Sequence, residues 1–429
     1  MPPRGGLPGL RRGTPADVTF LSFRDVSDKM ITLSARMRQV APSATKAMTQ
    51  MAADLRARGR DVVALSQGEP DFPTPAAVCE AAVRAIAEGR TTYTAVAGIL
   101  PLRQAIVAKF ARENGLDFTP DQVTVGCGAK QVLFNALMAT LDPGDEVVFA
   151  TPCWVSYPEM IKLAGGVPVP VATTAADGYR LRPEALRAAL TPRTRWLMLN
   201  SPANPTGAVA GVEDLAALAA VLRDFPQVMV LADDIYEHLV YGETAFATMA
   251  AVAPDLADRT LTVNGVSKSH AMTGWRVGYG AGPVELIRAM NTIQGQSTSH
   301  TCSIAQYAAI AALNGDPAVV EGFRSAFRRR RDLLCREIAA IPGLSFHLPQ
   351  GAFYLFVDCT ALIGRTTPVG QVIATDADLA LYLLDEAGVA LVPGSGFLAP
   401  GHLRISYAAA DDTLIRAVRA MAAAIARLS

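Results

Sequence analysis

The stretch Val266-Ser267-Lys268-Ser269-His270-Ala271-Met272-Thr273-Gly274-Trp275-Arg276 is the most informative part of this chain. A lysine lies between two serines, shortly before an arginine. A lysine amine condenses with an aldehyde, hydroxyl groups hold a phosphate ester, and a guanidinium binds phosphate through two hydrogen bonds. Pyridoxal phosphate carries an aldehyde and a phosphate on one small ring. The stretch therefore predicts a site for this cofactor, with Lys268, Ser267 and Arg276 as candidate ligands.

Few other lysines are candidates for this role, because the chain has only six. One lies in a polar leader. Three lie in helical patterns, where a solvated lysine is the usual outcome: Lys46, Lys109 and Lys162. Only Lys130 and Lys268 have surroundings rich in glycine or serine. Lys268 is the candidate that the neighbouring residues favour.

A second cluster follows the apolar run 228–232, which is typical of a buried strand. The run ends at Asp233, and Tyr236 comes three residues later. An aspartate at the carboxyl end of such a strand points into the crevice where α/β proteins bind ligands. There it would keep a pyridine nitrogen protonated, and the phenol would donate to a ring oxygen. The alternative is that Asp233 caps the next helix and Tyr236 packs in the core.

A third cluster, Asn200-Ser201-Pro202-Ala203-Asn204-Pro205-Thr206-Gly207, follows the predicted strand 196–199. Its prolines restrict the loop, and Asn204 between them offers an amide to a ring oxygen.

A fourth segment, 123–131, is predicted to form a strand, a glycine turn at Gly128 and a helix from about Ala129. The free N–H groups of a helix start bind anions. The lone Gly-x-Gly is not a dinucleotide fingerprint, because the third glycine and the acidic residue are missing.

Together these motifs resemble the class I aminotransferases of the type I pyridoxal-phosphate fold. The resemblance rests on S-P-x-N-P-T-G, D-x-I-Y, S-K-x-x-x-M-T-G-W-R and a late R-I-S-Y-A, and it runs from about Leu33 to the C-terminus. With Gly68-Glu69-Pro70-Asp71-Phe72 near the start, the chain looks most like the bacterial aspartate/prephenate aminotransferases.

The resemblance implies roles for residues that match the family's motifs. Lys268, Asp233 and Tyr236 would be catalytic, with Lys268 bound to the cofactor and moving the substrate proton. Arg404 and the backbone of Gly68 would bind the substrate α-carboxylate, next to Trp154 and Asn204. The residues that would hold pyridoxal 5'-phosphate are Lys268, Asp233, Tyr236, Asn204, Trp154, Ser267, Arg276, Gly128, Ala129 and Lys130. Tyr93 would reach the phosphate of a neighbouring subunit, which implies a homodimer with shared active sites.

The implied reaction moves an amino group between an amino acid and a 2-oxoacid, here aspartate and 2-oxoglutarate. Lys130 would bind the second carboxylate of an acidic substrate; the alternative is a surface lysine at a helix start. Family members that accept prephenate carry a lysine before P-S-A-T, where this chain has Ala41. We therefore expect weak or no prephenate transfer.

Two alternative functions stay open. One is an aminotransferase for prephenate, aromatic or neutral amino acids, and the other is a pyridoxal-phosphate lyase for C–S cleavage or β-elimination.

Composition restricts the class of protein. The formal net charge is zero, so nothing indicates nucleic acid or an anionic membrane surface as a partner. No apolar run has the length of a membrane span. The six cysteines are scattered without a C-x-x-C pair, which is typical of reduced thiols and favours a cytoplasmic protein. The five histidines show no metal-binding spacing, and we expect no metal.

Four segments are expected along the chain. Residues 1–32 are predicted to be a disordered leader, and 33–74 to join a small domain. Residues 75–314 would form a large cofactor-binding domain, and 315–429 a small α+β domain. Strands and helices alternate through the large domain, which predicts an α/β fold with a mostly parallel seven-stranded sheet covered on both faces. The expected strands lie near 123–125, 146–150, 168–171, 196–199, 228–232, 260–264 and 276–280 in the large domain, and at 352–357 and 389–392 in the small domain.

Overall fold

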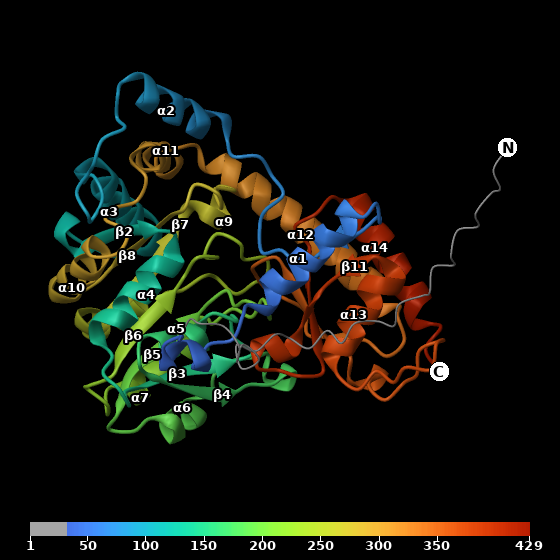
Figure 1. Cartoon of the computed structure of the whole chain (residues 1–429). Coiled ribbons are helices and arrows are strands. Elements are labelled where there is room, and N and C mark those ends of the chain that lie inside the picture. The colour runs from blue at the N-terminus through green and yellow to red at the C-terminus, as the bar shows by residue number, and fades with distance from the viewer. Residues whose placement is uncertain (1–31) are drawn as a thin grey trace.

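The computed structural model describes residues 32–429. All but the last residue of the predicted leader lies outside this range, so its disorder stays a prediction. The described chain forms a larger part around one sheet and a smaller part made by the two ends of the chain, coloured blue and red in Figure 1. No helix within residues 32–429 is long and apolar enough to cross a membrane.

The larger part is built on a seven-stranded sheet, as predicted, in the order β2-β8-β7-β6-β5-β3-β4. All the neighbouring pairs from β7 to β4 are parallel, whereas β8 is antiparallel to both β2 and β7. The strands are β2 (Val123–Cys127), β3 (Glu146–Thr151), β4 (Val167–Ala172), β5 (Thr194–Asn200), β6 (Met229–Asp233), β7 (Thr260–Gly265) and β8 (Val277–Ala281).

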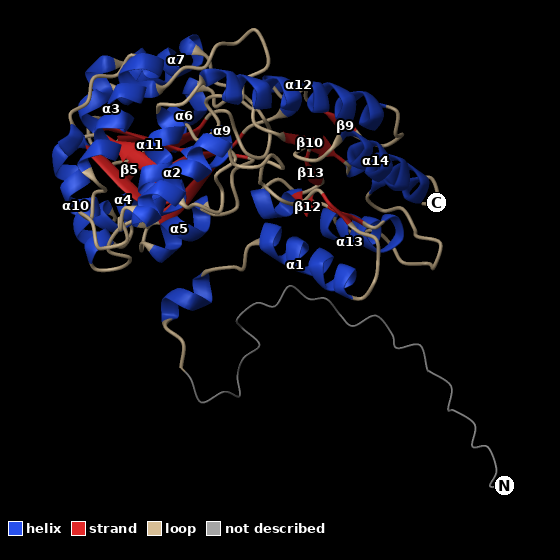
Figure 2. Ribbon diagram, turned by 90° about the horizontal axis from the view of Figure 1, so that it is seen from above, coloured by secondary structure: helices blue, strands red, loops and turns tan. Residues whose placement is uncertain are grey.

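Both faces of the sheet are buried, because successive side chains of a strand point to opposite faces. In β5, Trp196 and Met198 pack in one hydrophobic cluster and Leu197 in another. Helices cover the sheet on both faces (Figure 2). The helices of the larger part are α2 (Ala76–Ala87), α3 (Leu100–Asn114), α4 (Ala129–Thr140), α5 (Tyr157–Leu163), α6 (Pro183–Ala189), α7 (Val212–Leu222), α8 (Met249–Val252), α9 (Val266–Ser269), α10 (Val284–Gly295) and α11 (Ser303–Leu313).

The parallel strands deliver three of the sequence clusters to one edge of the sheet. Asn200 at the end of β5 pairs with Asp233 at the end of β6, and Asp233 pairs with Val263 of β7. Lys268 follows β7 directly, in the short helix α9. Because the carboxyl ends of parallel strands meet at one edge, residues that are up to 68 positions apart become neighbours.

The smaller part packs helices on a second, antiparallel sheet. Its four strands run in the order β12-β13-β10-β9. The sequence did not indicate β13, which carries Arg404, and the predicted strand 389–392 is divided between two sheets. The elements are α12 (Pro317–Ala339), β9 (Ser345–Phe346), β10 (Tyr354–Asp358), α13 (Asp376–Ala387), β11 (Val389–Ala390), β12 (Val392–Pro393), β13 (His402–Ser406) and α14 (Asp411–Ile425).

The N-terminal segment packs against this smaller part. Helix α1 (Ala44–Ala57) lies across the junction between the two parts in Figure 1, and β1 (Val63–Ala64) pairs in parallel with β11. Met48 and Ala52 of α1 share a hydrophobic cluster with Phe353 and Leu383. The division into segments 33–74, 75–314 and 315–429 stays a proposal.

Candidate active site

One pocket of about 590 Å³ lies between the two parts of the chain. Its walls come from the edge of the large sheet, the start of α4, the start of α1 and strands β10 and β13. Eleven of the thirteen predicted site residues line it: Gly68, Ala129, Lys130, Trp154, Asn204, Asp233, Tyr236, Ser267, Lys268, Arg276 and Arg404. Gly128 and Tyr93 do not.

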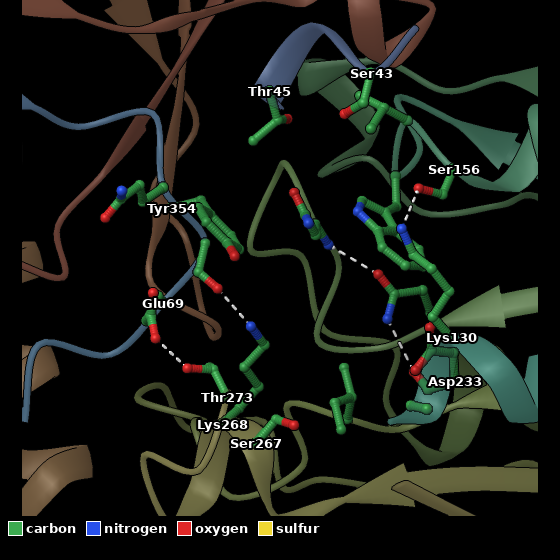
Figure 3. Close-up of a pocket in the computed structure, with 18 of the residues that line it drawn as sticks. Ser43, Thr45, Glu69, Lys130, Ser156, Asp233, Ser267, Lys268, Thr273 and Tyr354 are labelled. Carbon is green, nitrogen blue, oxygen red and sulfur yellow. Dashed lines mark hydrogen bonds between the residues drawn. The ribbon is translucent and has the colours of Figure 1, made fainter. Parts of the chain in front are cut away.

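Lys268 extends from α9 into the pocket, and its ammonium donates a hydrogen bond to the carbonyl oxygen of Gly68 (Figure 3). Within the described residues no carboxylate forms an ion pair with it. Burial lowers the pKa of Lys268 to about 8; the charge of Glu69 opposes this shift, and the charges of Arg276 and Arg404 act in the same direction as burial. An amine with this pKa is partly neutral near physiological pH, so it can act as a nucleophile or a base.

Asp233 lies at the end of β6 with only 4% of its surface exposed. Its Oδ2 accepts a hydrogen bond of 2.6 Å from the Tyr157 hydroxyl. Its Oδ1 is buried and has no partner among the described residues. Burial raises the pKa of Asp233 to about 6, although Tyr157, the backbone N–H of Ile235 and Lys268 oppose the shift. A buried carboxylate oxygen without a donor is costly, so this site is suited to a cationic or N–H group on a ligand.

Asn204 and Arg404 approach each other from the two parts of the chain. Arg404 donates to Oδ1 of Asn204 over 3.0 Å and to the Ser66 carbonyl over 2.6 Å. Its Nε is buried without a partner, and only 1% of the residue is exposed. Its guanidinium also lies 4.4 Å from the ring centroid of Tyr354. A buried guanidinium held by neutral groups alone keeps its charge free for an anionic ligand.

Gly128 and Arg276 meet at the start of α4. The backbone of Gly128 is in the left-handed region, with φ 83°, and a Cβ there would overlap the Arg276 guanidinium. Arg276 donates to the carbonyl oxygens of Thr273 and Cys127 at 3.0 and 3.2 Å. Gly278 is also required here, because a Cβ on it would overlap the backbone of Ala129. The glycines thus bring a guanidinium beside free helix N–H groups, which suits a phosphate.

Lys130, in the first turn of α4, turns toward α5. Its ammonium donates to the Ser156 hydroxyl over 3.0 Å and lies 4.5 Å from the ring centroid of Trp154. Figure 3 shows Lys130 and Ser156 on the same side of the pocket as Asp233, across from Glu69. Partial desolvation lowers the pKa of Lys130, with further contributions from Lys46 and Arg276.

Tyr236 and Tyr93 have opposite surroundings. Tyr236 is buried, and its hydroxyl shares a hydrogen bond of 2.8 Å with the hydroxyl of Tyr354. Tyr93 is 92% exposed and packs only against the edge of the His300 ring, 5.7 Å away. Within a single chain Tyr93 is therefore outside the pocket.

Sequence reasoning missed several pocket residues. Tyr157 holds Asp233, Tyr354 contacts Tyr236 and Arg404, and the Asn200 amide donates to the Asp233 carbonyl over 2.9 Å. Tyr157 lies three residues after Trp154, a spacing that places two side chains on one side of a helical turn and could have indicated it. Tyr354 lies in an apolar run and gave no signal.

Two lysines that were expected to be ordinary solvated residues have other surroundings. Lys109 is 1% exposed and forms an ion pair with buried Glu237, because α3 packs against the segment after β6. Lys46 is exposed but lines the pocket.

The ligand atoms of Glu113, Glu237 and His238 lie close enough to one another to hold a metal ion. The Lys109 ammonium contacts both carboxylates and already supplies the cation there. The absence of a metal stays a prediction.

Comparisons with known proteins agree on one family. The model of the class I and II aminotransferases matches residues 60–421. An aspartate/prephenate aminotransferase of Cereibacter sphaeroides is 54% identical over 93% of this chain and 100% of the relative. The structure of the aspartate aminotransferase from Rhizobium meliloti matches 93% of this chain and 100% of its own, with 48% identity and a TM-score of 0.90. That of the Thermus thermophilus aspartate aminotransferase with maleate matches 92% of this chain and 100% of its own, with 47% identity and a TM-score of 0.85.

Proposed function

Because this chain belongs to the family of class I and II aminotransferases, we propose that it transfers the amino group of aspartate to 2-oxoglutarate with pyridoxal 5'-phosphate. The products are oxaloacetate and glutamate. One observation carries the proposal: Lys268, Asp233 and Arg404 line a single pocket, and none of them has an ion-pair partner within the described chain. Relatives named aspartate aminotransferases, 46–48% identical, support the choice of substrate.

The pocket residues fit the cofactor chemically. The partnerless Oδ1 of Asp233 suits a protonated ring nitrogen, and Trp154 offers an aromatic face. The close approach of Gly128 to Arg276 leaves backbone N–H groups and a guanidinium for the phosphate. The residues that would hold the cofactor are Lys268, Asp233, Tyr236, Asn204, Trp154, Ser267, Arg276, Gly128, Ala129 and Lys130, with Tyr93 from a second subunit. When bound, pyridoxal phosphate supplies an aldehyde for the amino group and a ring that takes up electrons.

Lys268 moves the proton in this proposal. Its amine would hold the cofactor through the aldehyde, and the aldehyde would supply the carbon that takes up the substrate's amino group. The free amine then removes the proton from the substrate α-carbon as a general base and returns it as a general acid. A pKa of about 8 suits both tasks, because a useful fraction of each protonation state exists near neutral pH.

Asp233 and Arg404 orient the reacting molecules. Asp233 keeps a ring nitrogen charged, which stabilises the transition state more than the ground state. Tyr157 fixes its carboxylate through the bond to Oδ2. Arg404 holds the substrate α-carboxylate with the backbone of Gly68, and Asn204 locates the guanidinium through Oδ1. The side-chain carboxylate of aspartate then requires another cation, and Lys130 beside Trp154 supplies it.

We further propose a homodimer in which each subunit completes the other's site. The support is the 92% exposure of Tyr93, an aromatic residue that a soluble monomer would more commonly bury in part. Tyr93→Phe should weaken cofactor binding, and mixing it with inactive Lys268→Ala should restore part of the native cofactor affinity, since hybrid dimers contain one intact site. No restoration would exclude sharing through Tyr93.

The substrate assignment is tested by Lys130→Ala. We expect the KM for aspartate to rise about tenfold or more, with smaller changes for alanine and an aromatic amino acid, because only aspartate loses an ion pair. Equal losses for acidic and neutral substrates would contradict the assignment.

Prephenate should be a poor acceptor because Ala41 supplies no cation. Pyruvate or ammonia released without an added oxoacid would favour a lyase instead.

A further inference from the structure

The pocket contains one cation more than the proposed reaction uses. Five positively charged side chains line it: Lys46, Lys130, Lys268, Arg276 and Arg404. The proposed function assigns four of them to the side-chain carboxylate, the proton transfer, the phosphate and the α-carboxylate. Lys46 has no role in that assignment.

Lys46 lies in the first turn of α1, at the junction of the two parts of the chain. Its backbone N–H donates to the Ser43 hydroxyl over 3.4 Å, which begins the helix. Ser43 and Thr45 of the same turn also line the pocket, and Figure 3 shows both on the opposite side from Lys268 and Ser267. The backbone position of Lys46 is therefore fixed by a helix, whereas its side chain lines the pocket and is exposed to solvent.

No protein carboxylate neutralises Lys46. Within residues 32–429, no acidic side chain lies within ion-pair distance of its ammonium. Neither acidic residue of the pocket forms an ion pair with Lys46: Glu69 accepts a hydrogen bond from Thr273, and Asp233 accepts one from Tyr157. An exposed lysine without a partner is ordinary on a protein surface, but here it adds to the field of a cation-lined pocket.

The charge of Lys46 acts on Lys130. It is the second largest cause of the lowered pKa of Lys130, after desolvation. Two ammonium groups from different elements, α1 and α4, thus repel each other in one pocket. A carboxylate between them would be attracted by both and would remove the repulsion.

We propose that Lys46 is a specificity residue, which binds the side-chain carboxylate of dicarboxylic substrates together with Lys130. This inference rests on the proposed function, because it requires an acidic substrate in the pocket. Lys130, held against Trp154 and Ser156, provides the fixed contact. Lys46 reaches the same carboxylate from the first turn of α1.

The test measures binding of succinate and butyrate to the cofactor-loaded enzyme by calorimetry. These two molecules differ in one carboxylate, and neither can be transaminated. In Lys46→Met we expect succinate to bind about threefold to tenfold more weakly and butyrate to bind unchanged, since one solvent-exposed ion pair is lost. Lys46→Arg should restore most of the succinate affinity. Lys162→Met is the matched control, because it removes a lysine outside the pocket that already pairs with Glu159.

Lys130→Ala, measured in parallel, separates this proposal from the one on which it rests. If Lys130→Ala is the only variant that weakens the binding of succinate more than that of butyrate, the proposed role of Lys46 is wrong and the assignment of dicarboxylic substrates stands. If the unaltered enzyme binds butyrate as well as succinate, both proposals are wrong. Equal weakening of both ligands in Lys46→Met would indicate a structural role for the α1 turn and would also overturn the proposal.

Discussion

The end of β6 and the segment after it contribute buried acids to two sites, one without an ion pair and one with an ion pair. On one side, Asp233 and Lys268 line the active-site pocket without an ion-pair partner in the described chain. On the other, Glu237 and Lys109 pair with each other at the wall of a second pocket of about 510 Å³. All four residues are buried or nearly so. This difference indicates that charges paired within the chain stabilise the fold, whereas charges without a partner are available to bind ligands.

The pKa directions follow this difference. Burial acts to raise the pKa of Glu237, but Lys109 and His238 outweigh it, and the pKa is lowered. For Asp233 burial prevails, and the pKa rises to about 6. The same physical cause thus gives opposite results four residues apart, because only one of the two acids has an ammonium group in contact with it.

The largest effect is expected from Lys268→Ala. Removing the amine removes the covalent link and the proton carrier together, so turnover should fall by at least about 10⁴-fold. Rates of a single half-reaction with aspartate, followed by cofactor absorbance, measure this. The control Lys162→Met should stay near native. Near-native transamination by Lys268→Ala would transfer the role to Lys130.

Asp233→Asn should have the next largest effect. The amide keeps the shape of the side chain but loses the charge, so the half-reaction should slow by about 10²- to 10³-fold while cofactor affinity changes much less. Tyr157→Phe, which removes only the hydrogen bond to Asp233, should slow it less. Unchanged single-turnover rates in Asp233→Asn would return this residue to a helix-capping role.

Lys109→Met tests the second site, because it removes the ion pair between Lys109 and Glu237. It leaves the charge of Glu237 buried without its partner, which costs about 3–5 kcal/mol of stability. Urea unfolding should show a lower midpoint, while the half-reaction rate of the folded enzyme stays close to native. The double variant Lys109→Met/Glu237→Gln should recover part of the loss. A midpoint equal to that of the unaltered protein would show that the pair adds nothing to stability.

The smallest effect concerns pH and the cofactor-free chain. The pKa of Lys268 is lowered to about 8, and only the neutral amine condenses with an aldehyde. The rate of cofactor capture should therefore rise about tenfold per pH unit below that pKa and level off above it. Stopped-flow absorbance of pyridoxal phosphate mixed with the cofactor-free chain measures the profile. A rise that continues to about pH 10 would match an ordinary solvated lysine.

Much of the fold was predictable because its signals are local. All seven strands of the large sheet and the start of α4 at Ala129 were expected from apolar runs and glycine turns. Strand β13 was not, since His402–Ser406 mixes a charged residue with apolar ones and forms by pairing with β10 and β12. Similarly, the apolar run 389–392 gave no sign that Leu391 separates strands of two different sheets.

The sequence alone determined the family and the residues that carry its chemistry, because S-K-x-x-x-M-T-G-W-R and its companion motifs are contiguous stretches whose residue types are required by that chemistry. Only the tertiary structure decided which charged groups are paired. Lys109 meets Glu237 across 128 positions, Tyr157 meets Asp233 across 76, and Lys46 comes to the same pocket as Lys130. Such pairings depend on how distant elements pack, and a lysine in a helical pattern looks alike whether its ammonium meets water, a buried acid or a substrate.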